Sequence, residues 1–150
     1  HRRVAKTYWA FVEGKVVPSE GTWTDHLYKI HGMAQAKVVP ADHPGAKRAV
    51  LHYRVLFVSR RGTWLEVELE TGRTHQIRVQ AASRGYPILG DRQYGAEQPF
   101  GENHDDERAR AIALHARSLA FTHPETQDLV EVVAPVPLAW EELDLPVELF

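Results

Sequence analysis

The middle of the chain reads Leu69-Glu70-Thr71-Gly72-Arg73-Thr74-His75-Gln76-Ile77-Arg78-Val79. Before the glycine, apolar and acidic residues alternate, which is the pattern of a β-strand with one buried face. After the glycine, the apolar residues Ile77, Ala81 and Ala82 follow helical spacing. The stretch therefore predicts a strand that ends in a glycine turn and a helix that begins directly afterwards.

The helix is expected over residues 74–84, with Thr74 as its N-cap and Gly85 as the residue that ends it. Arg73 and Arg78 would then lie near the helix N-terminus, where unpaired backbone N–H groups also attract negative charge. Such a place suits a phosphate, or a carboxylate of the protein itself, because a guanidinium group donates two parallel hydrogen bonds to either. The alternative is that both arginines are surface charges on an amphipathic helix.

The remaining segments predict an antiparallel sheet. Residues 48–60 and 63–70 alternate around a short glycine-containing link, which is typical of a hairpin. Residues 1–14 predict a strand with both faces covered, and residues 22–46 are the least regular part. Four further elements are a short strand at 36–39, a hairpin from 119–121 and 129–133, a segment compatible with a helix at 107–116, and a short helix at 138–145. Hairpins without strand–helix alternation indicate an α+β class: a mainly antiparallel mixed sheet with a few flanking helices, in one domain of residues 1–150.

Composition narrows the choice of function. The 150 residues are 43% hydrophobic and 25% charged, which is ordinary for a globular protein, and no apolar run is long enough to suggest a membrane span. Cysteine is absent, which excludes disulfides and thiol catalysis and is compatible with a cytoplasmic location. The net charge is −2, but most Lys and Arg residues fall within residues 1–90, so a basic face can exist on a nearly neutral molecule. We expect a monomer.

The histidines do not predict a metal site. Four of the nine histidines lie from His26 to His52, and their spacing matches neither a helical pair nor a zinc signature. We interpret them as loop histidines and expect no metal ion. A metal-dependent hydrolase built on these histidines is therefore the least favoured hypothesis.

The central stretch resembles the signature of RluA-type pseudouridine synthases, together with Gly85-Tyr86-Pro87-Ile88-Leu89-Gly90-Asp91 and Tyr94-Gly95 at a fixed distance after it. Three other segments are similar to blocks of the same family: the strand Lys6-Thr7-Tyr8-Trp9-Ala10-Phe11-Val12-Glu13-Gly14, then Leu114-His115-Ala116, then Leu119-Ala120-Phe121-Thr122-His123-Pro124. The resemblance spans roughly residues 4–138. It implies the catalytic fold of that family, incomplete at its N-terminus.

The resemblance also implies an activity, the isomerisation of uridine to pseudouridine in the cytoplasm, in ribosomal or transfer RNA. In this family an aspartate attacks a flipped-out nucleotide, the glycosidic bond to the base breaks, and the base rejoins through C5, with no metal or organic cofactor. The implied partner is therefore an RNA stem-loop.

The matching positions imply a role for several side chains. Tyr8 would stack against the target base, although a sheet-core tyrosine is the alternative, and Arg78 would pair with the catalytic aspartate. The other matching residues would contact the substrate RNA or line its pocket: Arg73, Thr74, His75 and Gln76 at the turn, and Ile77 and Leu114 around the base. His115 is expected to serve packing rather than catalysis.

The nucleophile of the family is missing from this sequence. It belongs to a His-Arg-Leu-Asp motif upstream of the tyrosine strand, and none of the aspartates has that context: Asp25, Asp42, Asp91, Asp105, Asp106, Asp128 and Asp144. Asp91 matches a position that we interpret as structural. We therefore expect the chain to be the C-terminal part of a catalytic domain, inactive in isolation, with Arg78 facing an empty partner site. The alternative is a non-catalytic RNA-binding relative that has lost the aspartate.

Overall fold

The predicted central hairpin forms the middle of the sheet in the computed structural model, which describes residues 4–102, 111–146 and 148. Strand β4 (Lys47–Ser59) pairs with β5 (Gly62–Leu69) in antiparallel register, as the alternation of their side chains predicted. The link between them is short because Ser59 lies opposite Gly62. Gly62 has a φ of 153°, and a Cβ atom there would collide with the carbonyl oxygen of Val12. Only glycine lets the neighbouring strand approach this closely.

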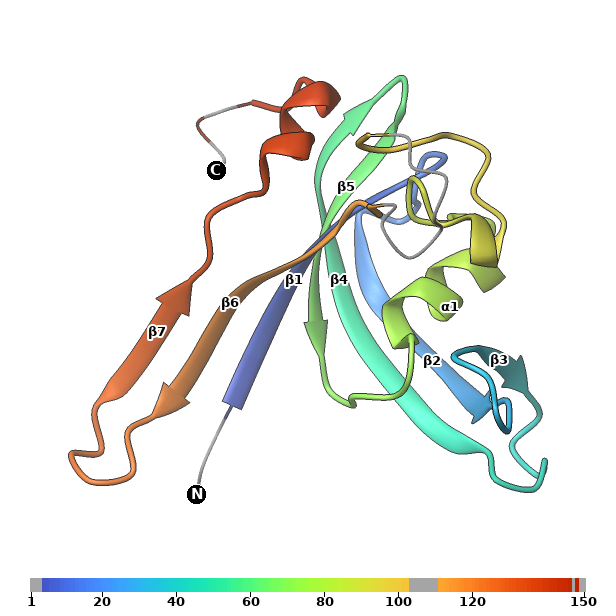
Figure 1. Ribbon diagram of the computed structural model, residues 1–150. Coiled ribbons are helices and arrows are strands. Elements are labelled where there is room, and N and C mark those ends of the chain that lie inside the picture. Colours follow the sequence, from blue (N-terminus) through green and yellow to red (C-terminus); the bar gives the residue numbers. More distant parts are fainter. Residues whose placement is uncertain (1–3, 103–110, 147, 149–150) are drawn as a thin grey trace.

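That neighbouring strand is β1 (Val4–Val12), and it lies between β5 and β6 (Leu114–Thr122). Its C-terminal half is buried on both faces, with Trp9 and Phe11 on one side and Ala10 on the other. The prediction of a strand covered on both sides is confirmed. Seven strands make up the sheet in the order β3-β2-β4-β5-β1-β6-β7, and all their pairings are antiparallel (Figure 1). The predicted fold class is therefore confirmed.

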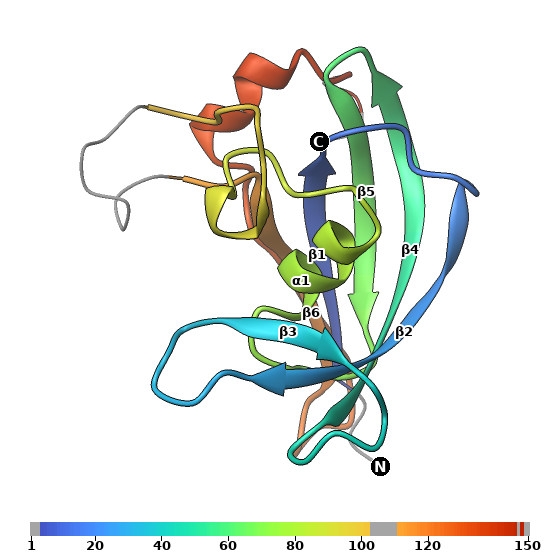
Figure 2. The same ribbon diagram turned by 90° about the vertical axis from the view of Figure 1, so that its right-hand side faces the viewer.

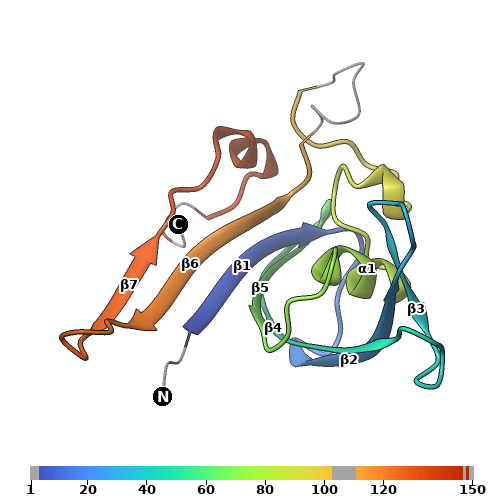
Figure 3. The same cartoon turned by 60° about the horizontal axis from the view of Figure 1, so that its bottom comes forward.

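One part of the sheet curves around the one α-helix in the described residues (Figures 2 and 3). Helix α1 (Gln76–Ser83) lies on the concave side of β5, β4 and β2, and its Gln80 side chain is fully buried there. The amide of Gln80 donates to the carboxylate of Asp25 at 2.8 Å and to the carbonyl oxygen of Trp23 at 3.2 Å. Arg84, just after the helix, also pairs with Asp25. These polar contacts anchor the helix to β2.

The opposite face carries a different cover. After β7 (Leu129–Val133), the 3₁₀ helix η3 (Leu138–Leu143) places Trp140 against Trp9, with ring centroids 6.4 Å apart. The predicted hairpin from residues 119–121 and 129–133 is confirmed as β6 and β7. The predicted terminal helix at 138–145 exists as this shorter 3₁₀ element. None of the helices that the structure describes is long and apolar enough to cross a membrane.

Two expectations about secondary structure were incomplete or wrong. The short strand at 36–39 is confirmed as β3 (Ala36–Val39), but its partner β2 (Glu20–Lys29) was missed. Asp25 points inward from β2 and contacts α1. A charged residue at an inward position breaks the alternation of apolar and polar residues by which a strand is recognised in a sequence. The suggested helix at 107–116 is wrong for residues 114–116, which belong to β6, and residues 107–110 lie outside the described part of the chain.

Candidate active site

The turn after β5 is held together by side chains of the central stretch. The Gln76 amide oxygen accepts hydrogen bonds from the Thr71 hydroxyl at 2.8 Å and from the Arg73 backbone N–H at 3.0 Å. Gln76 is only 3% exposed. Gln76 therefore shapes the turn, and its burial does not fit the expected contact with RNA.

The start of the helix differs from the prediction. Thr74 is exposed and is not the N-cap; that position is taken by His75, whose φ of 52° is left-handed and whose side chain makes no capping bond. The His75 ring turns instead toward Tyr94 and Arg78. These two hydrogen bonds offset the cost of a left-handed conformation in a residue other than glycine. The predicted end of the helix is confirmed, since Gly85 has a φ of 85°.

Arg78 has a carboxylate partner within this chain. Its Nε donates to Oδ2 of Asp91 at 2.9 Å, and Nη2 donates to Oδ1 at 2.8 Å. The expectation that Arg78 faces an empty partner site is therefore wrong. Asp91 is 1% exposed, and its hydrogen bond raises the pKa of Arg78, so the guanidinium stays charged. Asp91 has the structural role that the sequence analysis gave it.

Backbone pairing explains why Asp91 meets Arg78. Ile88 forms a bridge with Val12 at the end of β1, and the Leu89 N–H donates to the Phe11 carbonyl oxygen at 3.0 Å. The segment that leads to Asp91 is thus fixed against β1, while Arg78 is fixed by the helix. The two side chains come together although they are 13 residues apart in sequence.

The contacts of His75 define its protonation state. Arginine can only donate, so the 3.1 Å contact from Nη1 of Arg78 makes Nε2 of His75 an acceptor. The ring is then neutral with its proton on Nδ1, which donates to the Tyr94 hydroxyl oxygen at 2.7 Å. That oxygen also accepts from the Ala36 N–H at 3.0 Å. Burial, followed by the charge of Arg78, lowers the pKa of His75, which agrees with the neutral ring.

This geometry predicts a loss of stability in acid. Because the folded protein holds the pKa of His75 below its usual value of about 6.5, the neutral ring stabilises the fold above that pH, and this contribution is lost as the pH falls toward the lowered pKa. We expect the thermal unfolding temperature to fall more steeply with acid in the wild type than in His75→Asn. Asparagine tolerates the left-handed backbone and does not titrate in this range.

The control is His31→Asn, since His31 is exposed in the loop between β2 and β3. It should keep the acid dependence of the wild type. If His75→Asn and His31→Asn gave the same dependence on pH, the neutral His75 between Arg78 and Tyr94 would be contradicted.

Tyr8 and Leu114 lie on the face of the sheet that carries α1. Tyr8 lies opposite Val67 in β5, and Leu114 lies opposite Ala10 in β1. Both are half-buried and pack against the main core, in which Ile77 of the helix is 5% exposed. A pocket of about 270 Å³ adjoins Tyr8 on the part of the sheet formed by β1, β6 and β7. Among the described residues, no hydrogen bond or cation–π contact joins Tyr8 to Arg78.

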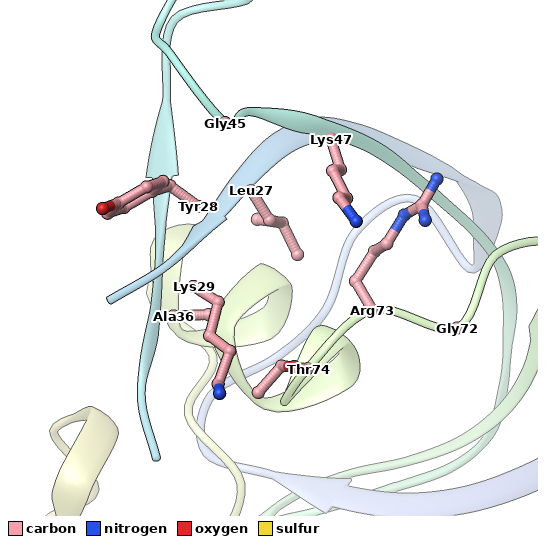
Figure 4. A pocket seen from close by; sticks show the side chains of 9 residues that line it. All are labelled: Leu27, Tyr28, Lys29, Ala36, Gly45, Lys47, Gly72, Arg73 and Thr74. Carbon is pink, nitrogen blue, oxygen red and sulfur yellow. The ribbon is translucent and has the colours of Figure 1, made fainter. Parts of the chain in front are cut away.

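Arg73 and Thr74 lie at another pocket, of about 240 Å³, beside the turn (Figure 4). Nε of Arg73 donates to the carbonyl oxygen of Arg48 at 2.9 Å, which fixes the guanidinium group at the pocket wall. Of the four turn residues expected to contact RNA, these two face solvent, whereas His75 and Gln76 are committed to contacts within the protein.

The described parts of the chain hold no group of three or more histidine, aspartate or glutamate side chains that could bind a metal ion. The arrangement can act chemically through other means. An arginine, a neutral histidine and two tyrosines lie on or beside one sheet face, which offers hydrogen bonds, positive charge and aromatic surface.

Comparison with known proteins decides the family. The family model described as RNA pseudouridylate synthase matches residues 1–83, which is more than half of the chain. The chain belongs to the RNA pseudouridylate synthase family. The resemblance of the central stretch to pseudouridine synthases is thereby confirmed.

Relatives within the pseudouridylate synthase family are longer than this chain. An uncharacterised RNA pseudouridine synthase from Synechocystis is 33% identical over 92% of the chain and 41% of its own length. Ribosomal large subunit pseudouridine synthase D from Haemophilus influenzae is 36% identical over 95% of the chain and 44% of its own length. The chain thus spans less than half the length of both relatives.

A solved structure shows the same fold. The human RNA pseudouridylate synthase domain containing 4 protein superposes with a TM-score of 0.76 at 24% identity, over 96% of this chain and 64% of its own. At this identity the similarity establishes the fold of the synthase domain alone.

Sequence reasoning missed two features of this candidate site. The first is the link from Arg78 through His75 to Tyr94, which is built from one helix and a later turn. The second is the pair Lys29 and Lys47, which lines the pocket beside Arg73. Each lysine lies at the end of a different strand, so no local sequence motif predicts that the two come together.

Proposed function

We propose that the protein containing this chain isomerises uridine to pseudouridine in RNA, and that ribosomal large-subunit RNA is its substrate. The observation that carries the proposal is the shared face of the sheet: β1 presents Tyr8 on the side where α1 presents Arg78. Membership of the synthase family supports this activity, and the name of the Haemophilus relative supports ribosomal RNA. Transfer RNA is the alternative substrate.

The reaction breaks the bond between C1′ and N1 of uridine and forms a bond between C1′ and C5; C5 loses its hydrogen as a proton and N1 gains a proton, so the product is an isomer of the substrate. The base must leave the stack before this exchange, and an extruded base needs an aromatic or apolar wall. Tyr8 can supply such a wall, because it lines a pocket on β1, β6 and β7. The apolar side chains of Ala116, Leu119 and Val132 line the same pocket. No metal or organic cofactor enters the proposal.

We place the nucleophile outside these 150 residues. Of the described aspartates, Asp25 is engaged by Gln80 and Arg84, and Asp91 is buried with both oxygens bonded to Arg78. The others, Asp42, Asp128 and Asp144, are exposed outside the strands and helices. The resemblance to the family supports a reactive aspartate upstream of β1.

The contacts of Arg78 indicate how this side chain could hold the nucleophilic aspartate. Three of the five N–H groups of Arg78 are used by Asp91 and Gln93, and one is used by His75. The second N–H of Nη1 has no partner among the described residues, so it can donate a hydrogen bond to the carboxylate of the nucleophilic aspartate. We infer that Asp91 and His75 aim the guanidinium, and that Arg78 offers this remaining donor to the nucleophile.

Two arginine variants of the full-length protein should separate binding from catalysis. Arg73→Gln should weaken RNA affinity with a smaller dependence on salt, because Arg73 faces solvent beside its pocket. Arg78→Lys keeps the charge but loses the planar fork, so we expect the catalytic rate on bound RNA to fall by about 10²-fold. Filter binding and single-turnover conversion measure the two effects. Equal and small effects of both variants would mean that neither arginine serves RNA binding or catalysis.

Pseudouridine mapping in cells tests the substrate. Cells that lack the gene should lose specific pseudouridines from large-subunit ribosomal RNA, and a plasmid copy should restore them. Loss from transfer RNA alone would overturn the choice of ribosomal RNA, and no loss in either RNA would overturn the activity.

The second candidate function is a non-catalytic RNA-binding protein, and the closed Arg78–Asp91 pair favours it, since this arginine is already neutralised. Under that hypothesis the full-length protein binds RNA but releases no C5 hydrogen. A single turnover assay with excess protein distinguishes the two candidates.

A further inference from the structure

The pocket beside the turn gathers positive charge from three separate elements. Lys29 ends β2, Lys47 begins β4, and Arg73 belongs to the turn before α1. Figure 4 shows the ammonium group of Lys47 and the guanidinium group of Arg73 on one side of the pocket, with Lys29 near Thr74 on the other. None of the nine lining residues is acidic.

The two lysines lie on the concave face, where the strand pattern calls for apolar side chains. Lys47 lies opposite Leu27, and Lys29 lies two residues further along β2 on the same side as Leu27. Leu27 is buried at 3% exposure and forms the inner wall of the pocket. Both lysines are exposed, so they place positive charge at the mouth of the pocket beside this buried leucine and attract an anion.

Nothing in the described parts of the chain provides that anion. No carboxylate lies within 4 Å of the charged atoms of Lys29, Lys47 or Arg73 in those parts. The Arg73 guanidinium is held in place by a backbone carbonyl oxygen, so it is oriented without being neutralised. Thr74 adds an exposed hydroxyl group at the rim.

We propose that this pocket binds a phosphate group of the substrate RNA backbone. Three cations and a hydroxyl group match the charge and the acceptor oxygens of a phosphodiester. The volume of about 240 Å³ is below the range of roughly 300 to 1,000 Å³ typical of sites for drug-sized ligands, which suits a phosphate rather than a whole nucleotide. The inference rests on the proposed function and deepens it.

The position of the pocket indicates what a phosphate contact there would do. Thr74 lies four residues before Arg78, so a phosphate held here is tied to the helix that carries the proposed catalytic arginine. Phosphate contacts set the register of a nucleic acid without reading its bases. The pocket would therefore position the strand that bears the target uridine on the concave face.

The test uses the full-length protein and a fluorescein-labelled stem-loop RNA with a uridine-containing loop. Lys29→Gln and Lys47→Gln should each weaken affinity several-fold and reduce the slope of log affinity against log salt by roughly 1. The matched control is Lys15→Gln, which removes the same charge from an exposed site in the loop between β1 and β2, outside the lining of the pocket, and should leave both quantities as in the wild type. Slopes that are equal in all four proteins would overturn the proposal.

A second arm separates RNA from a small free anion. Inorganic phosphate is added in a thermal-shift assay to the wild type and to the two pocket variants. If phosphate stabilises only the wild type while the salt slopes for RNA are unchanged, the pocket serves a free anion and the proposal fails. If the wild type forms pseudouridine and the pocket variants bind RNA normally, the pocket proposal fails alone. If the wild type binds no RNA, the proposed function fails with it.

Discussion

Incubated with RNA by themselves, these 150 residues are expected to form no pseudouridine. The proposed reaction requires a nucleophile; Asp25 and Asp91 are engaged within the protein, and none of the seven aspartates lies in the sequence context of the family's reactive aspartate. Removing the nucleophile of a serine protease costs about 10⁶-fold in catalytic rate, and a loss of that order would put turnover below detection. Release of tritium from RNA labelled at C5 of uridine measures the reaction directly, because that hydrogen leaves when C5 bonds to C1′.

The result is informative only if the isolated chain is folded. A cooperative thermal transition and the near-ultraviolet signal of the buried tryptophans Trp64 and Trp140 provide that control. The full-length protein provides the positive control on the same RNA. Tritium release by the folded chain alone would place the nucleophile within it, and Asp42→Asn, Asp128→Asn and Asp144→Asn would then identify which exposed aspartate acts.

The second large effect concerns stability. Asp91→Ala should lower the free energy of unfolding by about 3 to 5 kcal/mol, because it leaves the largely buried guanidinium of Arg78 without its two strongest hydrogen bonds. Asp91→Asn keeps the size of the side chain and one acceptor oxygen, so it should cost less. Urea unfolding of the chain measures both changes.

Glu70→Gln is the matched control for Asp91. Its carboxylate pairs with His52 at 2.9 Å, but both side chains are about half exposed, so this pair should contribute less than about 1 kcal/mol. A loss in Asp91→Ala no larger than the loss in Glu70→Gln would contradict the structural role of the Arg78–Asp91 pair.

The sequence predicted those parts of the fold in which one local rule dominates. The β4–β5 hairpin follows from clean alternation around Gly62, and the end of α1 follows from Gly85, which has the left-handed backbone that glycine favours. The strand that carries Tyr8 was predicted because aromatic and β-branched residues occupy both of its faces. The family resemblance supplied the function that we propose for these elements.

Tertiary contacts decided the features that the sequence did not predict. Strand β2 was not predicted because Asp25 occupies an inward position. Gln80 of the helix and Arg84 just after it donate hydrogen bonds to this carboxylate, and these partners are present only in the folded chain. The left-handed His75 replaced Thr74 as N-cap because its ring bonds to Tyr94 and Arg78. Neither partner could be identified from local spacing.

The candidate site was predicted in part for the same reason. The turn and its arginines are local, and they were recognised. The partner of Arg78 is not local, since Asp91 arrives through the pairing of its segment with β1. The basic pocket also combines ends of two strands with the turn, so its two lysines became visible only in the folded chain.

Tritium release by the full-length protein tests the central claim most directly. The protein that contains this chain should release tritium from C5-labelled ribosomal RNA in proportion to the pseudouridine formed, and its Arg78→Lys variant should do so about 10²-fold more slowly. If the full-length protein binds ribosomal and transfer RNA but releases no tritium from either, this chain is part of an RNA-binding protein and not of an isomerase.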